Sequence, residues 1–127
     1  MATSIIPACH MQIIENNGAT TTLNNNTATE LNSITLPAGQ WLVLACVRFA
    51  SNATGYRQAT ISTTTATVGT GMFLANVVPA VDGTNTFIYI STVLSPTEST
   101  TYYLNALQNS GGQRTGNYGH LKAIKIS

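Results

Sequence analysis

Residues 34–50, with the sequence ITLPAGQWLVLACVRFA, decide the fold of this chain. Pro37 and Gly39 predict a turn, because proline fixes φ and glycine reaches backbone angles that other residues avoid. The apolar run after the turn is too short to cross a bilayer, and its branched and aromatic side chains favour a strand over a helix. In a strand over 40–50 the side chains would alternate between two faces, both of them apolar. Since a sheet with one solvated face alternates apolar and polar residues, we expect this strand to be covered on both sides.

Two further predicted strands share this character, 86–94 clearly and 121–126 less clearly. A two-sheet sandwich covers only one face of each sheet internally, so a second apolar face predicts contact with a neighbouring subunit. Each large side chain that becomes fully buried contributes about 1.5–3 kcal/mol, so a few per subunit can hold an assembly together. The alternatives are the central strand of a barrel and a strand covered by a loop of the same chain.

The rest of the chain predicts short strands, with no sustained helical periodicity. Besides 40–50 and 86–94, strands are expected over 8–14, 19–23, 29–36, 56–63, 72–81, 100–109 and 120–126. Turns are expected at 15–18 and 82–85, which contain Asn-Gly and Asp-Gly, and 109–119 is expected to be a long glycine-rich loop. Pro79 predicts that its strand lies at a sheet edge or bulge. Regularly spaced short strands predict an all-β, antiparallel two-sheet sandwich or barrel of about 8–10 strands.

The composition is that of a single domain with few charged residues. The 127 residues suit one domain, in which only 7% of residues are charged and Thr, Asn, Ser and Gly fill the polar positions. A net charge of +1 does not predict electrostatic binding to nucleic acid or to an anionic membrane. No segment of the sequence predicts membrane insertion. Neutral, Thr/Asn-rich surfaces suit proteins that lie outside cells or on particles.

The residues that carry chemistry are scattered, so we expect no enzyme, no metal and no cofactor. An active site needs convergent acids, bases or metal ligands. The only acids are Glu15, Glu30, Asp82 and Glu98. His10 and His120 lack carboxylates at ligand spacing and are interpreted as structural histidines.

Cys9, Cys46 and Arg48 are the remaining unusual residues. The two cysteines could pair, although a domain with an ample core does not need the disulfide, and a buried free thiol is favoured. Arg48 interrupts the central apolar run and needs a partner if it is buried. That partner is Glu15, Glu30 or a carbonyl at a subunit interface.

Four segments resemble a known family: SITLPAGQWLV at 33–43, SNATGYR at 51–57, YYLNALQNSG at 102–111 and the short closing strand. They are similar to the TNF-like (complement globular-head-like) jelly-roll domains, most closely to the heads of bacteriophage tail fibres and receptor-binding proteins. The resemblance implies a ten-strand sandwich that forms a tight homotrimer. It also implies one head domain over 1–127, with 1–8 as a candidate lead-in from a shaft. The candidate trimer interface on the two-faced strands is Trp41, Val43, Phe87 and Tyr89.

In that arrangement, strand parity brings three loops to the tip far from the shaft: 51–55, 82–85 and 109–119. Aromatic rings, amides and a guanidinium suit polyols, because rings cover C–H faces and planar polar groups bond hydroxyls. The candidate ligand residues are Asn52, Tyr56, Arg57, Asp82, Asn85, Gln113, Arg114, Asn117 and Tyr118.

The resulting hypothesis is a non-enzymatic adhesion head of a phage tail tip, located on the virion or another extracellular surface. It would bind a carbohydrate on the surface of a bacterial host. The alternative is a structural trimerisation cap, or a spore- or particle-surface head without a ligand of its own.

Overall fold

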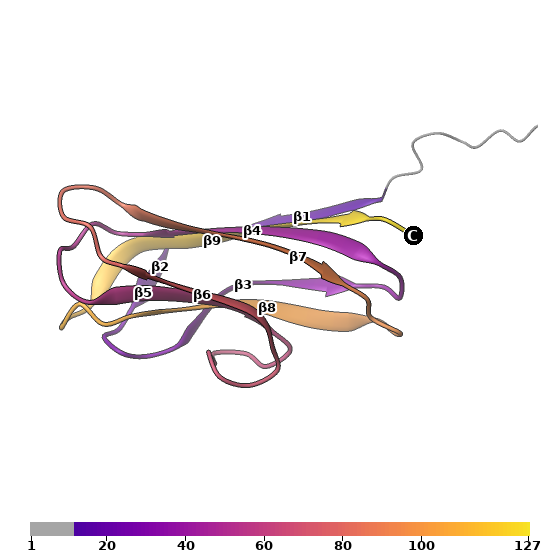
Figure 1. Ribbon diagram of the computed structural model, residues 1–127, viewed down its shortest axis with the longest axis horizontal. Helices are drawn as coiled ribbons and strands as arrows, with labels where there is room; N and C mark the ends of the chain where they lie inside the picture. The colour runs from indigo at the N-terminus through magenta and orange to yellow at the C-terminus, as the bar shows by residue number, and fades with distance from the viewer. Residues whose placement is uncertain (1–11) are drawn as a thin grey trace, which may run out of the picture.

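The structure, a computed structural model, describes residues 12–127 and contains nine strands and no helix in that range (Figure 1). The strands are β1 (Ile13–Asn17), β2 (Thr21–Leu23), β3 (Thr29–Leu36), β4 (Trp41–Phe49), β5 (Tyr56–Ser62), β6 (Met72–Pro79), β7 (Thr86–Leu94), β8 (Thr100–Gln108) and β9 (Arg114–Lys125). One sheet has the order β1-β9-β4-β7, with β2 also paired to β9, and the other has the order β3-β8-β5-β6. All the strand pairs are antiparallel, so the fold is the antiparallel two-sheet jelly-roll sandwich that the sequence predicted.

The core lies between the two sheets. Alternate residues of β4, from Trp41 to Phe49, point inward and are buried, together with Ile88 and Ile90 of β7. Leu104 and the other inward residues of β8 and β5 face them from the second sheet. This confirms the predicted alternation of β4, since one of its two apolar faces supplies the centre of the core.

The second sheet is covered on its outer side by residues 63–71, the segment that connects β5 to β6. Asn105 of β8 holds this segment in place, because its Nδ2 atom donates to the carbonyl oxygens of Thr64 and Thr67 at 2.9 and 2.7 Å. Its Oδ1 atom accepts from the backbone N–H of Ala66 at 3.1 Å. One sheet therefore has a loop over its outer side, which is one of the alternatives considered for the two-faced strands, but that sheet does not contain β4 or β7.

The start of the chain differs from the prediction. Residues 8–11 of the first predicted strand, the candidate lead-in 1–8, Cys9 and His10 lie outside the described residues. Residues 15–17 belong to β1 and do not form a hairpin turn, because β1 pairs with β9 and not with the strand that follows it. Gly18 is required by close packing, since a Cβ atom there would lie 2.3 Å from the carbonyl oxygen of Gly119.

The predicted loop 109–119 is wrong in its second half. Residues 114–119 belong to β9, which pairs with β2 at Asn117 and Arg114 and with β4 at Tyr118. Glycine weakens a strand locally, but two pairing partners supply the hydrogen bonds that keep this segment extended. Gly116, at a φ of 84°, accompanies a shift in the β2–β9 register. As predicted, Pro79 ends an edge strand, β6.

Candidate functional site

The outer face of the β1-β9-β4-β7 sheet is the first candidate site. The strand registers arrange its side chains in four rows across the sheet. The rows are Ile13-Ile124-Leu42-Val93, Glu15-Lys122-Leu44-Ser91, Asn17-His120-Cys46-Tyr89 and Tyr118-Arg48-Phe87. We call these residues the outer face.

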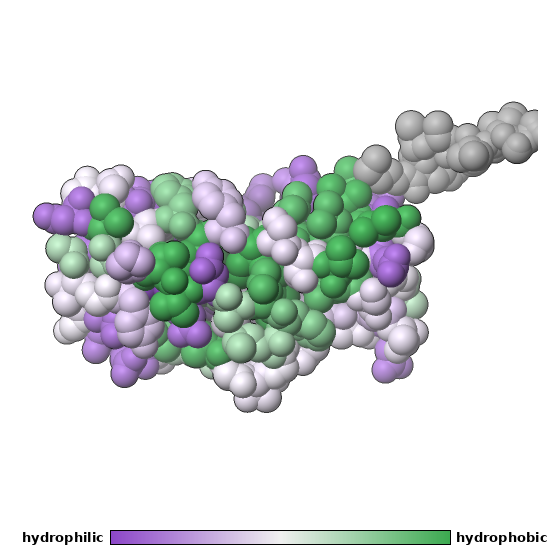
Figure 2. Space-filling model, in the orientation of Figure 1, coloured by the Kyte–Doolittle hydropathy of each residue, from purple (hydrophilic) through white to green (hydrophobic). Residues whose placement is uncertain are grey.

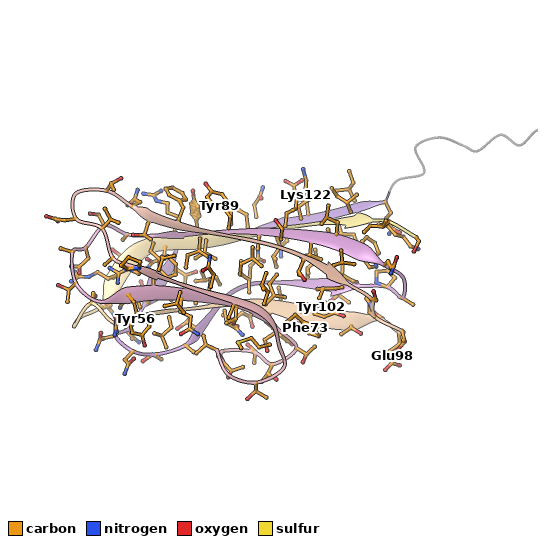
Figure 3. All side chains as sticks on the ribbon, viewed as in Figure 1. Tyr56, Phe73, Tyr89, Glu98, Tyr102 and Lys122 are labelled. Atoms are coloured by element: carbon orange, nitrogen blue, oxygen red, sulfur yellow. The ribbon has the colours of Figure 1, made fainter. Side chains whose placement is uncertain are left out.

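The outer face exposes large apolar side chains. Tyr89 is 69% exposed, Val93 52% and Phe87 43%, while Ile13 and Leu44 are 51% and 37% exposed. The rings of Phe87 and Tyr89 are stacked at 6.3 Å. Figure 3 shows Tyr89 and Lys122 pointing away from the other sheet. No segment of the described chain covers this face as 63–71 covers the other sheet, and so the second apolar face of β4 and β7 is open.

An aromatic and cationic group occupies the end of the outer face nearest the β4–β5 loop. The guanidinium carbon of Arg48 lies 5.4 Å from the centre of the Tyr118 ring, which in turn lies 4.6 Å from the His120 ring. Arg48 Nε and His120 Nδ1 are buried and have no hydrogen-bond partner among the described residues. An unpaired buried polar atom is unfavourable, so this part of the face would be stabilised by hydrogen-bond partners from outside the described chain.

The expected carboxylate partners of Arg48 are engaged elsewhere. Glu15 pairs with Lys122 at 3.6 Å, and a Glu30 oxygen accepts a hydrogen bond from the Thr65 hydroxyl. Arg48 is instead placed over the Tyr118 ring as a cation–π contact. A carbonyl of a neighbouring subunit remains the predicted partner.

Cys46 lies half-buried beside Tyr89 on the same face. Burial raises the pKa of the Cys46 thiol above its usual value, and a hydrogen bond with Tyr89 partly offsets this effect. The charge of Cys46 is the largest cause that raises the pKa of the Tyr89 hydroxyl. The two groups therefore interact, and both favour the neutral form at neutral pH.

The edge formed by β6 and β7 carries a second apolar surface. Met72, Phe73, Leu74 and Val77 of β6 are 47%, 47%, 39% and 55% exposed. The Phe73 ring meets Tyr102 edge-on at 5.3 Å, which anchors one side of this surface. Figure 2 shows apolar patches over β6 and β7, with polar residues between them. The sandwich thus offers two different apolar surfaces, a face and an adjoining edge.

The distal tip is the second candidate site. The β4–β5, β6–β7 and β8–β9 loops lie together at the end opposite the C-terminus and the start of β1 (Figure 1). The 24–26 segment joins them, because the Asn25 side chain accepts from the Gly111 N–H at 2.8 Å. Sequence reasoning missed this segment, since the Asn-Asn-Asn run indicates a loop without showing where the loop lies.

Three predicted ligand residues are used to build the tip. Arg57 is 1% exposed and donates to the carbonyl oxygens of Thr54, Tyr56 and Asn52 at 3.0–3.3 Å. Asn117 is fully buried and bonds the backbone of Thr21, Ala50 and Arg114. The Asn52 side chain accepts from the Thr54 N–H, which closes a turn of its own loop. These three side chains hold the loops and do not face a ligand.

Five of the other predicted ligand residues are at least partly exposed at the tip. Asp82 and Gln113 are exposed, while Tyr56, Asn85 and Arg114 are half-buried. Gln113 donates to the Asn24 side chain, and Arg114 Nε donates to the Ser110 hydroxyl at 3.0 Å. Tyr118 belongs to the outer face and not to the tip.

The predicted interface residues also divide into two groups. Phe87 and Tyr89 are on the outer face and exposed. Trp41 and Val43 are fully buried in the core and expose no surface that a neighbouring subunit could contact. The register explains the difference, because Phe87 and Tyr89 stand beside Arg48 and Cys46 on the face opposite to that of Trp41.

Neither candidate site encloses a ligand. The described residues form no pocket, and they bring no three His, Cys, Asp or Glu side chains together in a group that could hold a metal. The described part of the chain also contains no helix that could span a membrane. What both sites offer is surface for contact with another molecule.

No protein-family model and no curated protein matches the sequence. In structure, the chain is similar to VP2 of infectious bursal disease virus in a subviral particle, with a TM-score of 0.63 and 13% identity over 98% of this chain and 37% of that chain. A D431N mutant of VP2 in T=1 particles gives a TM-score of 0.61 and 17% identity over 98% and 36% of the two chains. A protein of Bacillus endospore appendages, described as disulfide-linked pili, is 12% identical over 100% of both chains at a TM-score of 0.44. The chain thus spans little more than a third of VP2, and this likeness concerns the fold.

Proposed function

We propose that this chain is a non-enzymatic, TNF-like head that assembles as a homotrimer through its outer face and meets a carbohydrate of a bacterial cell surface with its distal tip. The virion, as part of a phage tail, or another extracellular surface is the proposed location. The observation that carries the proposal is the open apolar outer face. Large exposed apolar side chains that gather on one face mark a candidate interaction site.

The apolar β6–β7 edge supports a ring-shaped assembly. An interface that joins two different surfaces of the same chain, here a face and an edge, is heterologous and produces a closed ring when the rotation between copies closes. The buried Arg48 Nε and His120 Nδ1 would find acceptors on the neighbouring copy. A dimer of identical faces would leave the β6–β7 edge uncovered.

The tip supports contact with a carbohydrate by its chemistry and its position. It presents an aromatic ring at Tyr56, amides at Asn85 and Gln113, and a guanidinium at Arg114 on loops that internal hydrogen bonds hold in place. Loops on a rigid scaffold are common binding sites. A surface without a pocket binds weakly, and an assembled head would compensate through several tips binding at once.

The experiment combines light scattering with binding to host cells and a panel of bacterial glycans. A molar mass of three times the 13.4 kDa chain, together with binding that is lost in a variant carrying Tyr56→Ala, Gln113→Ala and Arg114→Ala, is the expected result. Binding that survives these substitutions would contradict the role of the tip. A mass of one chain at micromolar concentration would contradict the assembly.

A structural head without a ligand is the second candidate function. It is favoured by Arg57 and Asn117, whose side chains form hydrogen bonds with backbone groups around the tip loops. For such a head the expected result is a stable assembly that binds neither cells nor glycans.

A further inference from the structure

Two arginines lie at the distal tip without a carboxylate beside them. Arg57 is the second residue of β5 and Arg114 is the first residue of β9, so both lie next to a tip loop. The positive charge of Arg114 is, after burial, the second cause that lowers the pKa of Arg57. Both positively charged side chains therefore belong to the same end of the sandwich.

The four acids of the chain do not neutralise this pair. Glu15 is paired with Lys122, and Glu30 accepts from the Thr65 hydroxyl. Glu98 lies at the opposite end of the molecule (Figure 3). Asp82 is in a tip loop, but within residues 12–127 it forms no salt bridge with either arginine.

The two arginines differ in the donors that they have left. Arg57 is buried, and its terminal nitrogens are bonded to three backbone carbonyls. Arg114 is half-buried, and the protein bond of its guanidinium runs from Nε to the Ser110 hydroxyl. Its Nη1 and Nη2 atoms have no partner in the described chain, and a planar guanidinium edge of this kind matches carboxylate and phosphate oxygens.

A chain of hydrogen bonds through buried residues holds the Arg114 guanidinium in place. The Ser110 hydroxyl that accepts from Nε also donates to the Gly112 carbonyl at 3.2 Å, and the Ser110 N–H donates to the side chain of Gln108 at 2.8 Å. Gln108 is fully buried and donates to the carbonyls of Leu23 and Gly112. A donor that is fixed before binding loses less conformational freedom when the ligand arrives.

We propose that the distal tip recognises an anionic group on the carbohydrate through the free guanidinium edge of Arg114, with Arg57 adding positive charge at the same end of the sandwich. This inference rests on the proposed function and specifies its ligand class. The anion is either the carboxylate of an acidic sugar or the phosphate of a polyol-phosphate polymer. In both cases the anion would bring a negative charge to an end of the sandwich where neither arginine forms a salt bridge in the described chain.

The test compares three soluble probes by calorimetry with the full chain: oligogalacturonate, poly(glycerol phosphate) and neutral dextran. Wild-type protein is expected to bind one or both anionic probes and not dextran, with an affinity that falls as salt rises. Which of the two binds more tightly distinguishes a carboxylate ligand from a phosphate ligand. R114Q is expected to weaken that binding about tenfold or more, as for loss of a hydrogen bond to a charged group. R114K keeps the positive charge but loses the two parallel N–H donors of the guanidinium, so its affinity should lie between that of wild type and that of R114Q.

K125Q is the matched control, because Lys125 ends β9 at the opposite end of the sandwich and packs over Trp41. K125Q should bind within about twofold of wild type, as a remote surface substitution does. Equal losses in R114Q and K125Q, or unchanged binding in R114Q, would overturn the inference, and so would binding of dextran as tight as that of the anionic probes. Cells that adsorb wild type and R114Q equally would overturn the anionic ligand while keeping the adhesion head, whereas no adsorption of wild type would remove the proposed function itself.

Discussion

Replacing Tyr89 by lysine is expected to dissociate the assembled head while the individual chain stays folded. Tyr89 is 69% exposed in the single chain, and a surface substitution of this kind changes the free energy of unfolding by about 0.5 kcal/mol or less. In an assembly through the outer face, the same position would be covered. The substitution therefore separates the stability of the fold from the stability of the interface.

The size of the effect follows from the exposed side chains. The exposed fractions of Ile13, Leu44, Phe87, Tyr89 and Val93 together equal about two and a half fully exposed side chains, whose burial contributes about 4–8 kcal/mol per chain. Tyr89 supplies the largest share, about 1–2 kcal/mol. A lysine there would also bury an ammonium group on a face that already carries Arg48 in the adjoining row, and an unpaired buried charge costs about 3–5 kcal/mol. A loss of about 4 kcal/mol or more weakens association about a thousandfold.

Light scattering over a concentration series measures this loss, with thermal unfolding of the same samples as a check on folding. Wild type is expected at three times the 13.4 kDa chain mass and Y89K at the mass of one chain. Thr97→Lys is the matched control, because Thr97 is exposed in the loop between β7 and β8 and the substitution adds the same charge outside both the outer face and the β6–β7 edge. A Y89K protein that keeps the wild-type mass would refute the reasoning, as would a wild-type protein that is already a single chain.

Three further predictions concern the fold and can be checked by urea unfolding. Asn105→Ala should lower the free energy of unfolding by about 3 kcal/mol, since three hydrogen bonds to the 63–71 segment are lost, and proteases should then cleave that segment. Gly18→Ala should cost about 1–3 kcal/mol, because the new methyl group meets the Gly119 carbonyl at 2.3 Å and neither backbone can retreat. The raised pKa of Cys46 means that the folded chain keeps the thiol proton to higher pH than the unfolded chain does. The free energy of unfolding should therefore fall as the pH rises through the usual thiol pKa of 9.0 and beyond. Cys46→Ser should lessen that fall.

Strand alternation made the architecture predictable from local sequence. The two apolar faces of the 40–50 segment became a core face and an open face, because neighbouring side chains of any strand point in opposite directions. A separate rule, that proline has no N–H to donate within a sheet, predicted an edge or a bulge at Pro79, and its strand β6 is an edge strand. Alternation did not group Trp41 with its true neighbours, since only the register between β4 and β7 shows that Phe87 and Tyr89 stand on the other face.

The tip was predictable as a place but not as a set of side chains. Strand parity brings the loops to one end, whereas the roles of individual polar residues depend on contacts that are distant in the sequence. Asn117 bonds Thr21 and Ala50, which precede it by 96 and 67 residues. Arg57 is buried by its own loop, which folds back so that three carbonyls face the guanidinium. A sequence shows that such groups can bond, but only the fold shows which of them are still free.

The position of the tip relative to the outer face explains how the proposed head would work. The outer face runs along β4, β7 and β9, and the tip loops lie at one end of the same strands (Figure 1). Copies joined through this face around an axis parallel to the strands would present all their tips in one direction, away from the end where the chain terminates. A single tip without a pocket has little surface for a ligand, and a millimolar site corresponds to only about 4 kcal/mol of binding free energy. Linking several such sites raises the overall affinity about 10²–10⁴-fold without any new contact, so the open apolar face would be what makes a shallow tip effective on a surface that repeats its ligand.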